Sequence, residues 1–306
     1  MRWIGDRESE NIEDRRGGGM PIAVGGIGGI GAIIVIVVGL FLGIDPTTLM
    51  SVLSGNQLPQ QQTQTGSSQQ QTDTRAAESG AYGTSRLPEA AQSDTVRHFV
   101  AVVLADTEDV WRQTFASSGR TYVEPKLVLY NGYMASPCGL ARTASGPFYC
   151  PNDQKVYLDL SFFEELRSRF HAPGEFAEAY VIAHEIGHHV QNSLGILKAA
   201  QREEAAKDRR AANAISVRVE LQADCLAGVW AYKADRMKHI IENGDVEAAL
   251  NAASAVGDDR LQQEARGTVV PDAFTHGSSA QRVRWFRRGL ASGDTRQCNT
   301  FAANEP

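Results

Sequence analysis

Residues 177–191 read Ala-Glu-Ala-Tyr-Val-Ile-Ala-His-Glu-Ile-Gly-His-His-Val-Gln and contain the pattern His-Glu-x-x-His at positions 184–188. Residues four apart lie on the same face of an α-helix, so His184 and His188 can offer two imidazole rings to one metal ion. Glu185 is next to them on the helix, where its carboxylate can act on a metal-bound water. The preceding residues are apolar, which favours a buried helix. The stretch predicts a zinc site, and the alternative is a chance match on a core helix.

A catalytic zinc site needs a third protein ligand and leaves its fourth position for water. Glu220 is the best candidate, because it lies in an apolar helical stretch where an unpaired acid would be costly to bury. Asp224, four residues later, shares its face and is expected to accept a hydrogen bond from a ligand histidine. A third histidine six residues after His188 is excluded, since that position is Leu194. The alternative for the two acids is a solvated helix face.

The N-terminal part of the chain predicts a membrane anchor. Residues 20–44 carry no charge and are long enough to span the hydrocarbon core of a bilayer. Arg15 and Arg16 precede this segment and no lysine or arginine follows it closely. The positive-inside rule therefore predicts a cytoplasmic tail over residues 1–19, a single-pass anchor in the cell membrane and an extracytoplasmic remainder. Residues 45–93 are rich in Gln, Ser and Thr and are expected to form a flexible linker.

Residues 94–306 are expected to form one α+β domain that is mostly helical with a small sheet. Short runs bounded by turn residues predict strands over residues 126–130, 146–150 and 155–159. Apolar residues at helical spacing predict helices over residues 95–115, 162–170, 176–194, 198–238, 245–263 and 280–288. The net charge of −6 gives no indication of a nucleic-acid partner.

The four cysteines form neither a Cys-x-x-Cys pair nor a dense framework. In an exported domain they are expected to form disulfides, which persist in that environment. Cys138 and Cys150 flank a short loop containing glycine and proline, which favours this pair and leaves Cys225 to pair with Cys298. Four cysteines allow three connectivities, and buried free thiols are the alternative.

Together these motifs resemble known metallopeptidases. His-Glu-x-x-His followed on a second helix by Glu-x-x-x-Asp is the gluzincin arrangement. Outside the linker, nearly the whole chain is similar to the bacterial neutral zinc metallopeptidase family. The motifs that carry this resemblance are residues 2–5, 13–17, 136–139, 146–150, 157–159, 183–191, 220–225 and 275–278. The resemblance implies a zincin-like domain behind the anchor and linker.

The resemblance also implies a mechanism for hydrolysing peptide bonds in protein or peptide substrates. Zn²⁺ would be held by His184, His188 and Glu220. Glu185 would take a proton from the zinc-bound water as general base and return it to the leaving amine. His276 is the candidate oxyanion donor, because Thr-His-Gly at positions 275–277 resembles a Thr-His-Pro element of the heat-shock metalloproteases. The alternative for His276 is a loop histidine that caps local structure.

Three further expectations concern residues around this site. Arg282 is expected either to orient an acid of the site or to cover the surface. His189 is expected to pack or bond behind its helix rather than bind metal. The strand around Tyr157 is the expected edge at which an extended peptide substrate pairs, an inference from the zincin resemblance.

Two other functions stay open at this point. One is a membrane-anchored envelope scaffold or interaction protein with a structural zinc site. The other is a zinc amidase that acts on non-protein amides with the same residues. Glu185 argues against the scaffold, because a structural zinc site has no use for a base and is closed by a fourth ligand.

Overall fold

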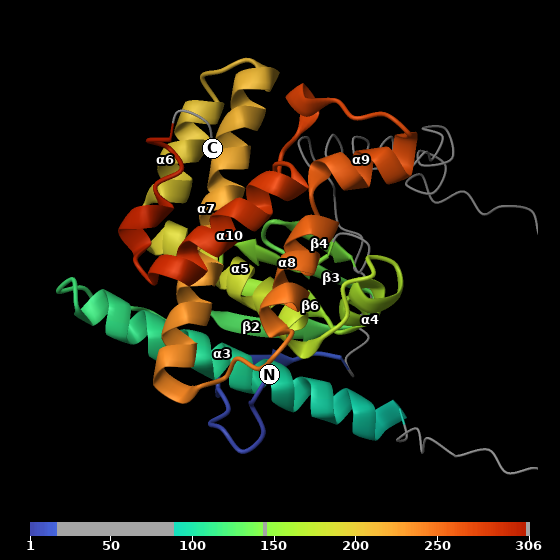
Figure 1. Ribbon diagram of the computed structural model, residues 1–306, viewed down its shortest axis with the longest axis vertical. Coiled ribbons are helices and arrows are strands. Elements are labelled where there is room, and N and C mark those ends of the chain that lie inside the picture. The colour runs from blue at the N-terminus through green and yellow to red at the C-terminus, as the bar shows by residue number, and fades with distance from the viewer. Residues whose placement is uncertain (17–88, 143–145, 304–306) are drawn as a thin grey trace, which may run out of the picture. The chain divides into compact units, whose positions relative to one another are not determined.

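The computed structural model describes residues 1–16, 89–142 and 146–303 (Figure 1). The predicted anchor over residues 20–44 lies outside the described residues, as does nearly all of the predicted linker. Within the described ranges, no helix combines the length and the apolar composition needed to cross a bilayer. Residues 1–16 belong to the same compact unit as residues 90–303.

A four-stranded sheet has the strand order β1-β2-β6-β5. Strands β1 (Ile12–Asp14), β2 (Lys126–Tyr130) and β6 (Lys155–Asp159) are parallel, and β5 (Phe148–Cys150) runs antiparallel to β6. Tyr157 on β6 therefore lies opposite residues of both β2 and β5, and our expectation of an exposed edge there is wrong. A short apolar strand has the same sequence pattern in the middle of a sheet as at its border. Among the described strands, β5 forms the edge on that side.

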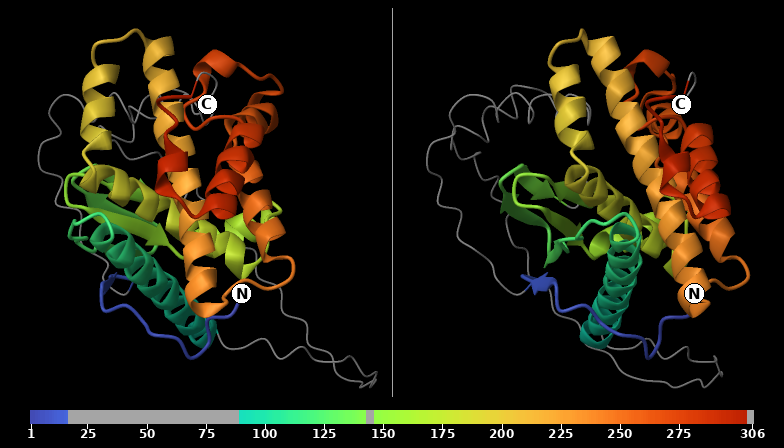
Figure 2. Two further views of the ribbon diagram at one scale, coloured as in Figure 1. Left: turned by 60° about the vertical axis from the view of Figure 1, so that its left-hand side comes forward. Right: turned by 90° about the vertical axis from the view of Figure 1, so that its left-hand side faces the viewer.

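Strand β1 comes from the N-terminal segment, which we expected to be a tail separate from the domain. Leu127 N donates to Asn11 O and Arg15 N donates to Leu129 O, each over 2.8 Å. Figure 2 shows the segment in blue, running past helix α3 (Glu89–Ala116) to the edge of the sheet. The expected separation is therefore wrong for residues 1–16. It rested on a count of flanking charges, which carries no information about backbone pairing.

The two faces of the sheet are covered differently. Leu127, Leu129 and Leu158 point to one face and join α3 and α5 (Glu175–Ser193) in the main hydrophobic core. Val128 and Tyr157 point to the other face, because successive side chains of a strand alternate. That face is covered by the hairpin of β3 (Tyr133–Ser136) and β4 (Gly139–Arg142), which the Cys138–Cys150 disulfide ties to β5.

The remaining helices surround α5 and match the predicted stretches, except that two of those stretches are divided. Asp208 accepts a hydrogen bond from Ala211 N and starts a new helix within residues 198–238. Ser278 and Gln281 form a capping box at the start of the last helix. The helices are α4 (Ser161–Ser168), α6 (Ile196–Glu204), α7 (Arg209–Lys238), α8 (Asp245–Ala255), α9 (Asp258–Arg266) and α10 (Ser279–Ser292), with 3₁₀ turns η2 (Pro271–Ala273) and η3 (Thr295–Cys298).

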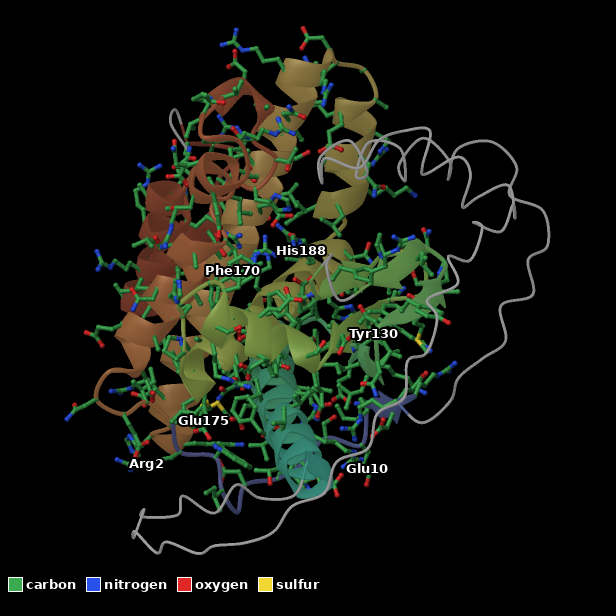
Figure 3. The ribbon with its side chains drawn as sticks, turned by 90° about the vertical axis from the view of Figure 1, so that its right-hand side faces the viewer. Arg2, Glu10, Tyr130, Phe170, Glu175 and His188 are labelled. Atoms are coloured by element: carbon green, nitrogen blue, oxygen red, sulfur yellow. A yellow bond between two sulfur atoms is a disulfide. The ribbon has the colours of Figure 1, made fainter. Side chains whose placement is uncertain are left out.

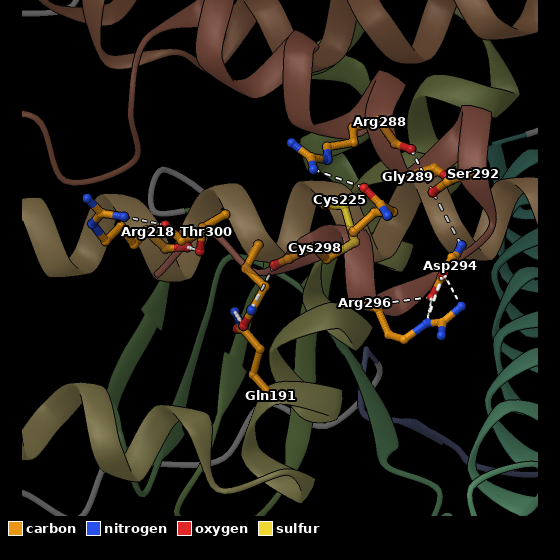
Figure 4. The surroundings of a disulfide bond; sticks show 12 residues. Gln191, Arg218, Cys225, Arg288, Gly289, Ser292, Asp294, Arg296, Cys298 and Thr300 are labelled. Carbon is orange, nitrogen blue, oxygen red and sulfur yellow. Dashed lines mark hydrogen bonds and ion pairs between the residues drawn. A yellow bond between two sulfur atoms is a disulfide. The ribbon is translucent and has the colours of Figure 1, made fainter. Parts of the chain in front are cut away.

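Helices α7 and α10 cross with their backbones in close contact. A Cβ atom at Gly289 would collide with the carbonyl oxygen of Cys225, and one at Gly228 would collide with that of Phe286. Only glycine has no Cβ atom, so these two positions permit the crossing. The predicted Cys225–Cys298 disulfide is present and fastens η3 to α7 beside Gly289 (Figure 4).

Candidate metal centre

Helices α5 and α7 bring together the three side chains that the sequence predicts as metal ligands. The Nε2 atom of His184 lies 3.1 Å from Glu220 Oε2, and the Nε2 atom of His188 lies 3.4 Å from Glu220 Oε1. One ligand-type atom from each residue lies within 4.8 Å of the other two. Gly187 faces the backbone of Ala223 at this point, where a Cβ atom would come within 3.0 Å of the carbonyl oxygen. The missing side chain lets the two helices approach.

The donor set fits a zinc ion. Two imidazole nitrogens and one carboxylate oxygen are ligands that Zn²⁺ binds in catalytic sites, which keep a fourth position open. Within the described ranges, no further histidine, cysteine, aspartate or glutamate joins the group formed by His184, His188 and Glu220. The arrangement therefore matches an open site better than a closed structural one.

Asp224 orients His184 from behind. Its Oδ1 atom lies 2.9 Å from His184 Nδ1 and also accepts hydrogen bonds from Tyr180 OH at 2.5 Å and Arg282 Nη2 at 2.9 Å. Arg282 Nε donates to Oδ2 over 2.9 Å. Burial raises the pKa of Asp224, but Arg282 and His184 outweigh burial and lower it overall. The ionised carboxylate holds the Nδ1 proton of His184, so Nε2 faces the metal position.

These contacts decide the role of Arg282, which the sequence left open. The side chain is buried and orients an acid of the site rather than covering the surface. Tyr180 and His184 come from α5, Arg282 comes from α10, and Asp224 itself is on α7. No spacing rule within one helix could have predicted this three-helix cluster.

His188 is held by a different partner. Its Nδ1 atom lies 2.8 Å from Gln191 Oε1. The amide nitrogen of Gln191 donates to Val219 O over 2.7 Å and to Gln222 Oε1 over 3.0 Å, which fixes the direction of the side chain. Sequence reasoning missed Gln191. Its position three residues after His188 on the same helix was the available signal.

Glu185 lies beside the ligands at the edge of the sheet. The side chain is 8% exposed, and burial raises the pKa of its carboxyl group above the ordinary value. The backbone of Tyr149 on β5 lies near enough to this carboxylate to lower its pKa slightly, against the larger effect of burial. Glu185 therefore connects the metal position to the outer strand of the sheet.

His276 lies in the loop before α10, and Asp258 determines the shape of this loop. The backbone N–H groups of Thr275, His276 and Gly277 donate to Asp258 Oδ2 over 2.6, 2.6 and 3.1 Å. The Nδ1 atom of His276 lies 3.2 Å from Asp258 Oδ1, which leaves Nε2 available to another partner. The charges of His276 and Glu220 shift each other's pKa, so the loop lies close to the ligands.

Asp258 was also missed from the sequence, where it appears as an ordinary acid in the first turn of a helix. His189 behaves as expected. Its ring nitrogens lie 3.1 Å from Tyr149 OH and 2.7 Å from Val123 O, on the side of α5 away from the ligands. Its partners are β5 and the loop before β2.

The chain is similar to several bacterial proteins over most of its length. It is 45% identical to "Uncharacterized protein YpfJ" of Escherichia coli K12, with 98% of this chain and 99% of the relative covered. It is 40% identical to "Uncharacterized protein Rv2575" of Mycobacterium tuberculosis H37Rv, with 77% of this chain and 81% of the relative covered. No solved structure matches the chain. A family model matches residues 1–301, and the chain belongs to that family, described as "Putative neutral zinc metallopeptidase".

Proposed function

We propose that this protein is a zinc-dependent peptidase that hydrolyses peptide bonds outside the cytoplasm, at a membrane to which residues 20–44 bind it. The observation that carries the proposal is a buried carboxylate, Glu185, beside an open group of two histidines and one glutamate. Family membership supports the same reaction class. The two disulfides support an oxidising compartment for the domain.

The side chains divide the work of hydrolysis as follows. Zinc, when bound by His184, His188 and Glu220, would supply a Lewis acid that polarises the scissile carbonyl group. Glu185 would take a proton from the attacking water and return it to the leaving amine. Its raised pKa brings it closer to neutral pH, where a group can both accept and donate a proton efficiently.

His276 is proposed as the donor to the carbonyl oxygen in the transition state. A preorganised donor lowers the barrier because it is already aimed at the atom on which charge develops. Asp258 holds His276 through its ring and through the backbone of its loop. The side chain of His276 is 51% exposed; partial desolvation lowers its pKa, but Asp258 and Glu220 outweigh this effect and raise the pKa overall. The protonated ring would be the stronger donor.

The substrate is proposed to pair with the outer edge of β5. The strand containing Tyr157, β6, cannot serve this role because it lies inside the sheet. Strand β5 is at the border of the described sheet and follows a pattern of peptide binding in which an extended segment adds to a sheet edge. The backbone of Tyr149 on β5 lies near Glu185. A peptide that lies along β5 would pass next to the base and the metal position.

The test measures zinc content and cleavage of casein and of a peptide mixture by the full chain. We expect one zinc ion per native chain and measurable cleavage. Glu185→Gln should keep the zinc and lose activity by about 10²- to 10⁴-fold, because it removes only the proton acceptor. His98→Asn is the control, since the ring of His98 is exposed and pairs with Glu8 rather than with a residue of the metal centre.

Three other results would each contradict a different part of the proposal. Equal cleavage by the native chain and Glu185→Gln would exclude the proposed base. Stoichiometric zinc with no hydrolysis of any amide would point to the scaffold. Cleavage restricted to non-protein amides would point to the amidase.

A further inference from the structure

The N-terminal segment is fixed to the domain through a buried acid on α3. Arg7 donates from Nη1 and Nη2 to Glu108 Oε2, each over 3.0 Å. Ser9 Oγ and Asn11 Nδ2 donate to Glu108 Oε1, the latter over 2.9 Å. Glu108 is buried, so these three residues satisfy a carboxylate that water does not reach.

Both ends of the segment are fixed as well. At its start, Arg2 N donates to Ile240 O over 2.9 Å, and the ring of Trp3 packs edge-on against Phe99 with the centroids 5.4 Å apart. Figure 3 shows Arg2 near Glu175, at the beginning of α5. At its end, β1 pairs with β2, and Lys155 Nζ donates to Glu13 over 2.8 Å.

Removal of the N-terminal segment would leave a buried carboxylate and one edge of the sheet without their partners. Glu108 would keep only Arg112, whose nearest nitrogen is 3.6 Å away, and the edge of β2 would lose its backbone partner. Leaving a buried carboxylate without its hydrogen bonds costs several kcal/mol. The docked segment is therefore an integral part of the folded domain.

We infer that residues 1–16 and the domain containing the metal centre occupy the same side of the membrane. Backbone hydrogen bonds and the Arg7–Glu108 pair act over about 3 Å and cannot connect residues on opposite sides of a core roughly 30 Å thick. The expected topology, with residues 1–19 in the cytoplasm and the domain outside, is incompatible with these contacts. The two disulfides indicate that the shared compartment is the extracytoplasmic one.

This inference replaces the cytoplasmic N-terminus that we expected from Arg15 and Arg16. Both arginines are paired with neighbouring acids, Arg15 with Glu13 at 2.8 Å and Arg16 with Asp14 at 2.5 Å. They are part of the docked strand and its extension. The inference does not depend on the proposed peptidase activity.

Single-cysteine labelling of the full chain in spheroplasts tests the inference. All four native cysteines are in disulfides, so an introduced cysteine supplies the only thiol. Ile4→Cys reports on the segment and Met237→Cys on the domain, and the native side chains are 88% and 43% exposed. Glu10→Cys is a second exposed reporter on the segment. A membrane-impermeant maleimide is added before lysis, and full labelling after detergent provides the reference.

We expect all three variants to react to the same extent in intact spheroplasts. Protection of Ile4→Cys and Glu10→Cys together with labelling of Met237→Cys would overturn the inference. Protection of all three would support one shared compartment and would instead exclude the extracytoplasmic location. Zinc content and peptide cleavage are measured separately, so a failure of the proposed function leaves this result unaffected.

Discussion

Asp224 and Glu108 are two buried carboxylates with nearly the same set of partners. Asp224 binds the guanidinium group of Arg282, the hydroxyl group of Tyr180 and the ring nitrogen of His184. Glu108 binds the guanidinium group of one arginine, the hydroxyl group of a serine and the side-chain amide of an asparagine. Each carboxylate joins segments that are distant in the sequence.

The two clusters differ in the second partner of the third donor, which is Asn11 at Glu108 and His184 at Asp224. The asparagine bound to Glu108 also donates to Glu124, a second acid on the surface of the domain. The histidine bound to Asp224 instead presents its other nitrogen to Glu220 and the metal position. The same polar arrangement thus stabilises the fold in one place and orients a ligand in the other.

The largest effect is expected for Asp224→Ala. Removing this acid leaves Arg282 buried without its partner and frees the ring of His184. We expect a loss of about 3–5 kcal/mol in the free energy of unfolding. We also expect about 10- to 100-fold weaker zinc binding. Denaturant unfolding and competition with a chelator measure the two quantities, and Asp224→Asn provides a milder variant. Unchanged zinc affinity in both variants would refute the orienting role.

Glu108→Ala is the matched substitution in the cluster that binds the N-terminal segment to α3. Arg7, Ser9 and Asn11 would lose their common acceptor, and we expect a stability loss of about 3 kcal/mol. Zinc affinity should stay within about twofold of the native value, because no ligand contacts this acid. A large fall in zinc affinity of the folded protein would show that the two regions are coupled.

The pH dependence of zinc binding tests the metal centre separately from the Glu108 cluster, which contains no histidine. Burial lowers the pKa of His184, but Asp224 and Glu220 outweigh it and raise the pKa to about 10, and the pKa of His188 is also raised. The metal-free site therefore holds protons at neutral pH that zinc must displace. With two histidines, affinity should fall by up to about a hundredfold for each unit by which the pH is lowered. Chelator competition between about pH 6 and about pH 8 measures the slope, and a flat profile would contradict it.

The smallest effect is expected for Asp258→Ala. His276 would lose the carboxylate that fixes its ring, and peptide cleavage should fall by about 10- to 100-fold with zinc content unchanged. Asp258→Asn can still accept the backbone hydrogen bonds of the loop, so it separates loop shape from charge. We expect it to lower the upper pH limit of kcat, because the pKa of His276 would drop. Full activity in both variants would exclude His276 as the positioned donor.

The sequence predicted the parts of the site that lie within single helices. His184 and His188, and likewise Glu220 and Asp224, are four residues apart, and helix geometry alone aligns such pairs. The structure brings the two pairs together at the α5–α7 contact. Both expected cysteine pairs are also present. They could be predicted because one pair closes a short loop, which leaves only one choice for the other.

The remaining parts depend on contacts between elements that no local pattern encodes. Arg282 reaches Asp224 only because α10 crosses α7, and Asp258 at the start of α9 reaches His276 in the loop before α10. The central position of β6 and the pairing of β1 with β2 are set by the order of strands in the sheet. The order of strands follows from packing of the whole domain, which a count of charges or apolar residues does not capture.

Gly228 and Gly289 have a consequence for genetics. Neither residue carries a functional group, yet any side chain there forces α10 away from α7 and takes Arg282 from Asp224. A mutational screen scored only by activity would place both glycines among the most sensitive positions, beside the metal ligands. Soluble yield and zinc content would tell the two groups apart, because ligand variants should fold without metal whereas glycine variants should fail to accumulate.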